Sequence, residues 1–68
     1  MLILCKKGSG WFIGRIVHEY VSGHPYNHYI ENEHYQRMSA DDVHDIEKVW
    51  ILSDNDEVVP STLDKLGF

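Results

Sequence analysis

Histidine and cysteine are the residues of this chain best suited to bind a metal. The sequence contains five histidines and a single cysteine, Cys5. Of the histidines, His24, His28 and His34 are the candidate ligands of a structural metal, which would help so short a chain to fold. None of the usual close pairs of zinc ligands is present, however. The spacing therefore favours partly exposed polar histidines, with no metal and no cofactor; a histidine-bound, metal-stabilised structural domain is kept as an alternative.

Nucleophilic catalysis requires a nucleophile, a base and a group that orients the base. Cys5 and His18 form the conceivable pair, but Cys5 lies in the apolar run Leu2–Cys5, where a thiol is usually buried and inert. The paired carboxylates Asp41–Asp42 and Asp54–Asp56 occupy cap and turn positions, which are normally solvated. We therefore expect the protein not to be an enzyme.

Acidic residues are concentrated in one half of the chain. The net charge is −5, and residues 31–57 contain nine carboxylates against Arg37 and Lys48. This balance argues against direct nucleic-acid binding, which needs a basic footprint. Solvated helix starts and turns are one explanation of the acids. The other is a face that docks on the basic surface of a partner protein and regulates or inhibits it. The residues of this candidate face are Asp41, Asp42, Asp45 and Glu47.

Tryptophans supply a second candidate contact. Trp11 shares one face of a predicted strand with Ile13 and Val17, and Trp50 shares a strand face with Leu52. A small β domain cannot bury both sides of every strand, so one of these patches is expected to be exposed and to bind a partner or a second copy in a homodimer. Trp50 and Trp11 are the expected anchors.

Short strands separated by turn residues must position these side chains. The stretch Gly10–Val17 follows the turn signal Gly8-Ser9-Gly10 and is predicted to be the central strand, with Gly14 at a sharp bend or at a close crossing of another strand. Ser39 is the expected N-cap of a short helix, and Ser61 that of a last turn ended by apolar residues. The expected strands cover about 2–6, 11–20, 26–31, 34–38, 48–52 and 57–59, where Pro60 ends the last one, and the helix covers about 40–47.

Part of this pattern resembles a known family. The order of residues in Trp11–Val17, followed by Tyr26–Glu31 and Gln36–Val43, is similar to SH3-like barrels of the Tudor type over about residues 2–52. That resemblance implies a binding module in which an aromatic cage holds a methylated lysine or arginine. The cage walls would be Trp11, Tyr26 and Tyr29, and a Tudor-like reader of methylated peptides is the second alternative function.

The fold expected from these patterns is mainly β. It is a small SH3-like barrel or a strongly bent antiparallel sheet of five to six short strands, with one short helix and a C-terminal helical turn, in a single domain over 1–68. The sequence contains no apolar run long enough to cross a membrane. With its lone Cys5 it suggests an intracellular, cytoplasmic protein without membrane contact.

Overall fold

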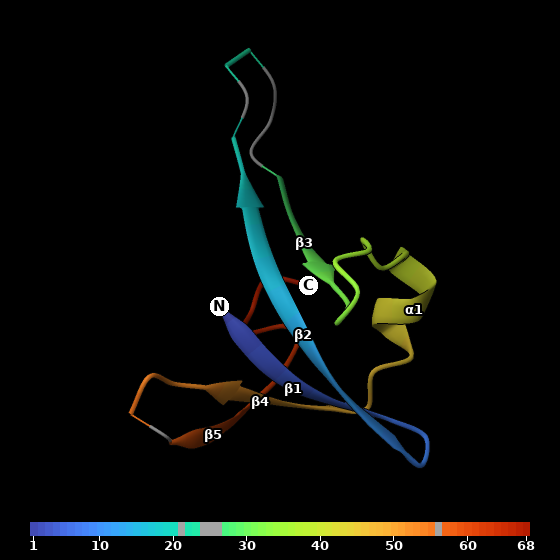
Figure 1. Cartoon of the computed structure of the whole chain (residues 1–68). Helices are drawn as coiled ribbons and strands as arrows, with labels where there is room; N and C mark the ends of the chain where they lie inside the picture. The colour runs from blue at the N-terminus through green and yellow to red at the C-terminus, as the bar shows by residue number, and fades with distance from the viewer. Residues whose placement is uncertain (21, 24–26, 56) are drawn as a thin grey trace.

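The computed structural model describes residues 1–20, 22–23, 27–55 and 57–68. It forms one antiparallel sheet with the strand order β3-β2-β1-β4-β5 (Figure 1). The bounds of the elements are β1 Leu2–Lys7, β2 Gly10–Glu19, β3 Asn27–Glu31, α1 Ala40–His44, β4 Lys48–Leu52 and β5 Val58–Ser61. The sheet is unclosed, since β3 and β5 do not pair with each other. The expected mainly-β fold is confirmed, as a sheet rather than a closed barrel.

The sheet begins with a tight hairpin. Lys7 pairs with Gly10, which leaves Gly8 and Ser9 as a two-residue turn, and Gly8 has a φ of 59°. Glycine at the first position of such a turn adopts this backbone conformation without steric cost. The hairpin that the sequence predicted at Gly8-Ser9-Gly10 is thus confirmed.

β2 links two hairpins that overlap only slightly. Its first half, Gly10–Arg15, pairs with β1, and its second half, Arg15–Glu19, pairs with β3. The β2–β3 hairpin therefore projects beyond the rest of the sheet (Figure 1). The middle strand is β1, not β2 as the sequence suggested, because β4 returns along the free edge of β1.

Gly14 lies near the junction of the two hairpins and is buried. A Cβ atom at this position would lie 3.1 Å from Ile30 Cγ2 and 3.5 Å from Ile3 Cγ1. Glycine therefore lets β1 and β3 approach the same point of β2, which confirms the close approach expected from the sequence.

The core lies on one face of the sheet only. Seven side chains from β1, β2, β3, β4 and the helical region are buried together: Ile3, Cys5, Ile16, Ile30, Val43, Ile46 and Val49. Phe12, Met38, Leu63, Leu66 and Phe68 pack against them. α1 and the C-terminal residues thus cover this face, which we call the core face; the opposite face of the sheet is the outer face.

Three of the expected elements differ in the structure. Residues 34–38 form a loop instead of a strand, and only Arg37 makes an isolated bridge, to Glu31. The helix ends at His44 rather than near residue 47. β5 continues through Pro60, because β5 is an edge strand and the missing N–H of proline is tolerated there.

The C-terminal helical turn is confirmed over residues 62–67. Leu66 N–H donates to Thr62 O (3.2 Å), and Phe68 N–H donates to Leu63 O (2.9 Å). Its cap is Thr62, whose Oγ1 accepts from Lys65 N–H at 3.2 Å, and not Ser61, which is the last residue of β5. At the start of α1, Ser39 is the N-cap as expected, accepting from Asp42 N–H.

Candidate functional site

The two tryptophans that the sequence singled out lie together on the outer face. Their ring centroids are 5.1 Å apart, with the planes tilted by 36°. Trp11 is opposite Lys6, and Trp50 is opposite Leu4, so the two rings meet across β1, which lies between their strands. Trp11 remains 56% exposed. The sequence predicted two separate strand patches; the register joins them into one.

Apolar side chains continue this surface across four strands. One cross-strand row holds Ile13, Leu4, Trp50 and Pro60, and the next holds Arg15, Leu2, Leu52 and Val58. Large parts of Leu2, Ile13 and Val58 are exposed. Among the described residues, the helix and the C-terminal turn pack on the core face and leave the tryptophans uncovered. The loop after β3 borders the outer face at Arg15, whose Cζ lies 5.0 Å from the centroid of the Tyr35 ring. We call this surface the aromatic patch: Leu2, Leu4, Trp11, Ile13, Trp50, Leu52, Val58 and Pro60.

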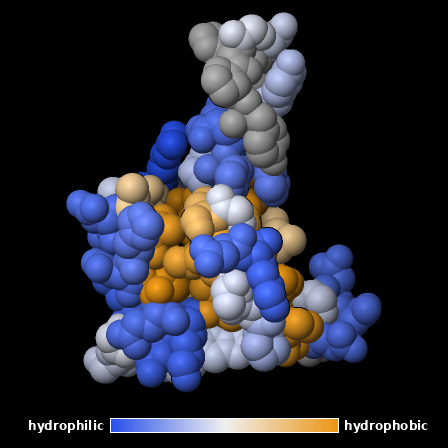
Figure 2. Space-filling model, turned by 180° about the vertical axis from the view of Figure 1, so that it is seen from behind, coloured by the Kyte–Doolittle hydropathy of each residue, from blue (hydrophilic) through white to orange (hydrophobic). Residues whose placement is uncertain are grey.

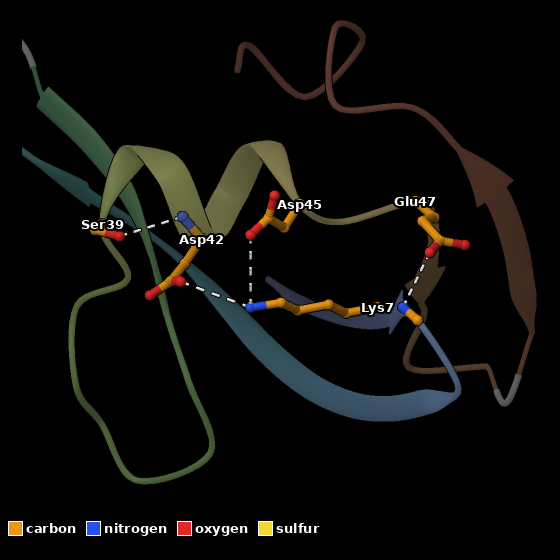
Figure 3. Close-up of polar contacts among 6 residues, drawn as sticks. Lys7, Ser39, Asp42, Asp45 and Glu47 are labelled. Atoms are coloured by element: carbon orange, nitrogen blue, oxygen red, sulfur yellow. Dashed lines mark hydrogen bonds and ion pairs between the residues drawn. The ribbon is translucent and has the colours of Figure 1, made fainter.

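The acidic residues lie elsewhere and are partly engaged within the molecule. Lys7 Nζ lies 3.6 Å from Asp42 Oδ1 and 3.9 Å from Asp45 Oδ2, and Glu47 Oε1 accepts from Gly8 N–H at 3.0 Å (Figure 3). These contacts join the β1–β2 turn to the helical region. All three carboxylates are exposed, so each ion pair contributes at most about 1 kcal/mol.

The acidic residues and the aromatic patch do not form one surface. Lys7 alternates along β1 with the buried Ile3 and Cys5, so it belongs to the core face. There it contacts the carboxylates of α1 and of its C-cap. Trp11 and Trp50 belong to the outer face. A single flat partner surface therefore cannot contact both groups at once.

The proposed walls of a methyl-lysine cage are not brought together. Trp11 is opposite Lys6, whereas Tyr29 is opposite Val17, six positions further along β2, or about 20 Å at the usual rise of a strand. The Tyr29 ring is already covered by Arg37, whose Cζ lies 4.7 Å from the ring centroid. Tyr26 lies outside the described residues.

The candidate metal ligands His28 and His34 contact different parts of the chain. His28 Nε2 is 2.7 Å from the carbonyl oxygen of Gly67, and His34 Nε2 is 3.8 Å from Glu33 Oε1. His24 is not among the residues that the structure describes. Within the described ranges, no group of three histidine, cysteine or acidic side chains could hold a metal ion.

Cys5 is fully buried, and burial raises the pKa of its thiol to about 11. The thiolate is the reactive form, so this thiol is unreactive near neutral pH. His18, its only conceivable partner, is paired with His28 in the projecting hairpin, far along β2 from Phe12, which is opposite Cys5. The two residues therefore do not form a nucleophile–base pair.

A cavity of about 320 Å³ opens between β3, the helix and the C-terminal turn. Its lining includes Ile30, Met38, Val43, Leu63 and Phe68, with His28, Arg37 and His44 among its polar residues. Figure 2, seen from behind relative to Figure 1, shows apolar surface in the middle of the body between hydrophilic flanks. Sequence reasoning missed this cavity because it is formed by segments far apart in the chain.

Comparison of the chain with protein-family models, with curated proteins and with solved structures found no match. The described residues contain no helix that is long and apolar enough to cross a membrane.

Proposed function

We propose that this protein is a small, non-enzymatic interaction module that binds a partner protein through the aromatic patch. The observation that carries the proposal is the Trp11–Trp50 pair, with Trp11 exposed and Trp50 half-buried, on an apolar sheet face. Contiguous apolar surface of this kind usually marks an interaction site. Tryptophan is also enriched among the residues that dominate binding energy at protein interfaces.

The acidic residues are a second proposed contact, for a partner with a basic surface. Asp41 directly precedes Asp42, one of the partners of Lys7, in α1. All four acidic residues of the candidate face are exposed: Asp41, Asp42, Asp45 and Glu47. Because the intramolecular partners of these carboxylates are only weakly held at the surface, a partner's lysine or arginine could replace them. Binding at this site would be sensitive to salt.

A Tudor-type module is the finer alternative within the same class of binding module, but the unclosed sheet and the separation of Trp11 from Tyr29 along β2 count against its methyl-lysine cage. Its support is the residue order of Trp11–Val17 and a small antiparallel β fold. Tryptophan fluorescence during titration with methylated lysine peptides tests it, and an unchanged signal would exclude a cage that contains Trp11.

Capture experiments with matched baits test the main proposal. We expect Trp11→Ser to weaken binding of captured partners at least tenfold, the effect of removing a dominant interface residue. Tyr20→Ser is the control, because Tyr20 is 73% exposed and lies outside the aromatic patch. Circular dichroism checks that each bait is folded. If both variants retain the partners of the unaltered protein, the patch is not the docking surface.

The acidic contact needs a control of its own. Replacing Asp41, Asp42, Asp45 and Glu47 by the corresponding amides removes the acidic contact, but it also removes the ion pairs of Lys7. Lys7→Met breaks the same ion pairs and keeps every carboxylate. Partners that the amide variant loses and Lys7→Met retains would bind the carboxylates themselves. Partners that both variants lose would show instead that the ion pairs of Lys7 are needed to keep the fold intact.

A further inference from the structure

Two lysines stand directly opposite each other on the outer face. Lys6 of β1 is the register partner of Lys48 of β4, and Trp11 is the register partner of Lys6 on the other side. Like charges in directly opposed positions destabilise a sheet. In the part of the chain that the structure describes, the ion pairs of lysine involve Lys7 and neither Lys6 nor Lys48. Within the described residues, no ion pair therefore compensates the unfavourable lysine pair.

The lysine pair adjoins the aromatic patch. The row that contains Lys6 and Lys48 is followed directly by the row with Leu4 and Trp50, and the indole of Trp50 contacts that of Trp11. The register thus places two lysines in the row next to the paired tryptophans. A ligand group that fits both has a carboxylate next to an apolar or aromatic side chain.

We propose that the Lys6–Lys48 pair and the Trp11–Trp50 pair together bind an acidic, apolar segment of a partner protein. A carboxylate of the segment lies between the two ammonium groups, and its neighbouring apolar side chain packs on the indoles. This inference rests on the proposed function and specifies the chemistry of the partner at the aromatic patch. It differs from the basic partner expected for the acidic residues on the other side of the sheet.

A second copy of the chain fits this surface less well. It would bring a second Lys6–Lys48 pair, while the carboxylates that the described strands place on the outer face, Glu19 and Glu31, lie where β2 pairs with β3. Nucleic acid also fits less well, because the net charge of −5 repels a polyanion and most of the patch is aliphatic. Both occupants are tested as competing outcomes below.

Selection from a random peptide display library on the immobilised protein tests the proposal. We expect the unaltered protein to enrich peptides in which aspartate or glutamate stands beside aromatic or aliphatic residues. Lys48→Glu should weaken the binding of these peptides at least tenfold, and raising the salt concentration should weaken binding to the unaltered protein. Lys65→Glu is the matched control, since Lys65 is exposed on the C-terminal turn and the charge change is identical.

A second readout does not depend on any ligand. Lys48→Glu converts the opposed like charges into an opposite-charge pair with Lys6, so its melting temperature should rise, whereas that of Lys65→Glu should not. A fall in the melting temperature of Lys48→Glu would show that the lysine pair is not unfavourable and would contradict the argument.

The remaining outcomes separate this inference from the proposed function. Enriched peptides that are apolar but uncharged, and that are lost with Trp11→Ser, would overturn the acidic partner and leave the interaction module standing. Absence of enrichment on the unaltered protein would count against both. Displacement of bound peptide by single-stranded oligothymidylate, or sedimentation as a dimer that Trp11→Ser dissociates, would overturn the inference in favour of nucleic acid or a second copy.

Discussion

At the scale of single residues, Cys5 shows how burial determines chemistry. Cys5 belongs to the core cluster with Ile3 and Val49 and has no exposed surface. Burial disfavours the charged form, which is why the pKa rises from 9.0 to about 11. The prediction from the sequence that Cys5 is inert follows from its place in an apolar run; the structure adds the magnitude of the shift.

Cys5 makes stability dependent on alkaline pH. The unfolded thiol loses its proton near pH 9, but the folded thiol keeps it until about pH 11, so the unfolded state binds fewer protons between these values. The free energy of unfolding should therefore fall as pH rises, by about 1 kcal/mol between pH 8 and pH 10. Urea unfolding of the protein and of Cys5→Ala at both pH values measures this.

The difference between the two proteins isolates the thiol, because Cys5→Ala replaces no other titratable side chain. Parallel stability curves for the protein and Cys5→Ala would contradict the assigned shift.

At the scale of elements, the loop after β3 replaces a strand that the sequence predicted. Asn32 Oδ1 accepts hydrogen bonds from the backbone N–H groups of His34 (2.8 Å) and Gln36 (3.0 Å). Tyr35 takes a φ of 62°, which a strand does not allow. Asparagine side chains commonly offer the backbone this alternative to a ladder. The sequence pattern of 34–38 is compatible with a strand, but the side chain of Asn32 determines the outcome.

The loop gives an element-scale prediction. Asn32→Ala removes the acceptor of two backbone donors and should lower the free energy of unfolding by about 1–2 kcal/mol. Asn32→Asp keeps an acceptor oxygen, so its free energy of unfolding should fall by less than that of Asn32→Ala. Thermal or urea unfolding followed by circular dichroism gives both values. Equal losses in the two variants would show that the amide oxygen does not hold the loop.

At the scale of the whole molecule, the stability of a single sheet depends on the segments that cover its core face. The cover consists of α1, which spans only five residues, and the C-terminal turn with Leu63, Leu66 and Phe68. The Phe68 ring lies 4.6 Å from that of His28 on β3. A domain of this size has only about 3–5 kcal/mol of stability, so each covering side chain matters.

Phe68→Ala should therefore cost about 2 kcal/mol, less than for a fully buried phenylalanine because the ring is half-buried. This loss is a large fraction of the total stability of the domain. It should therefore lower the urea concentration at the midpoint of unfolding markedly. Lys65→Ala, on the exposed side of the same turn, should leave the midpoint nearly unchanged. If Phe68→Ala were as stable as Lys65→Ala, the turn would not be part of the core.

The sequence by itself determined the local elements. Gly8 and Gly10 indicated the first hairpin, Ser39 the helix start, and Gly14 a close approach, because turn geometry, capping and the absence of a Cβ depend on residue type. The sequence did not predict the loop at Asn32. It also did not predict that β1 is the middle strand, since strand order depends on contacts between distant segments.

Only the tertiary structure decided how the candidate site is composed. The strand register, which no local pattern shows, joins Trp11 to Trp50, sets Lys6 against Lys48, and separates all four from the acidic residues that contact Lys7. The physical reason is that residue type and spacing assign a side chain to one face of its own strand. The pairing of strands far apart in the chain decides which side chains become neighbours on that face.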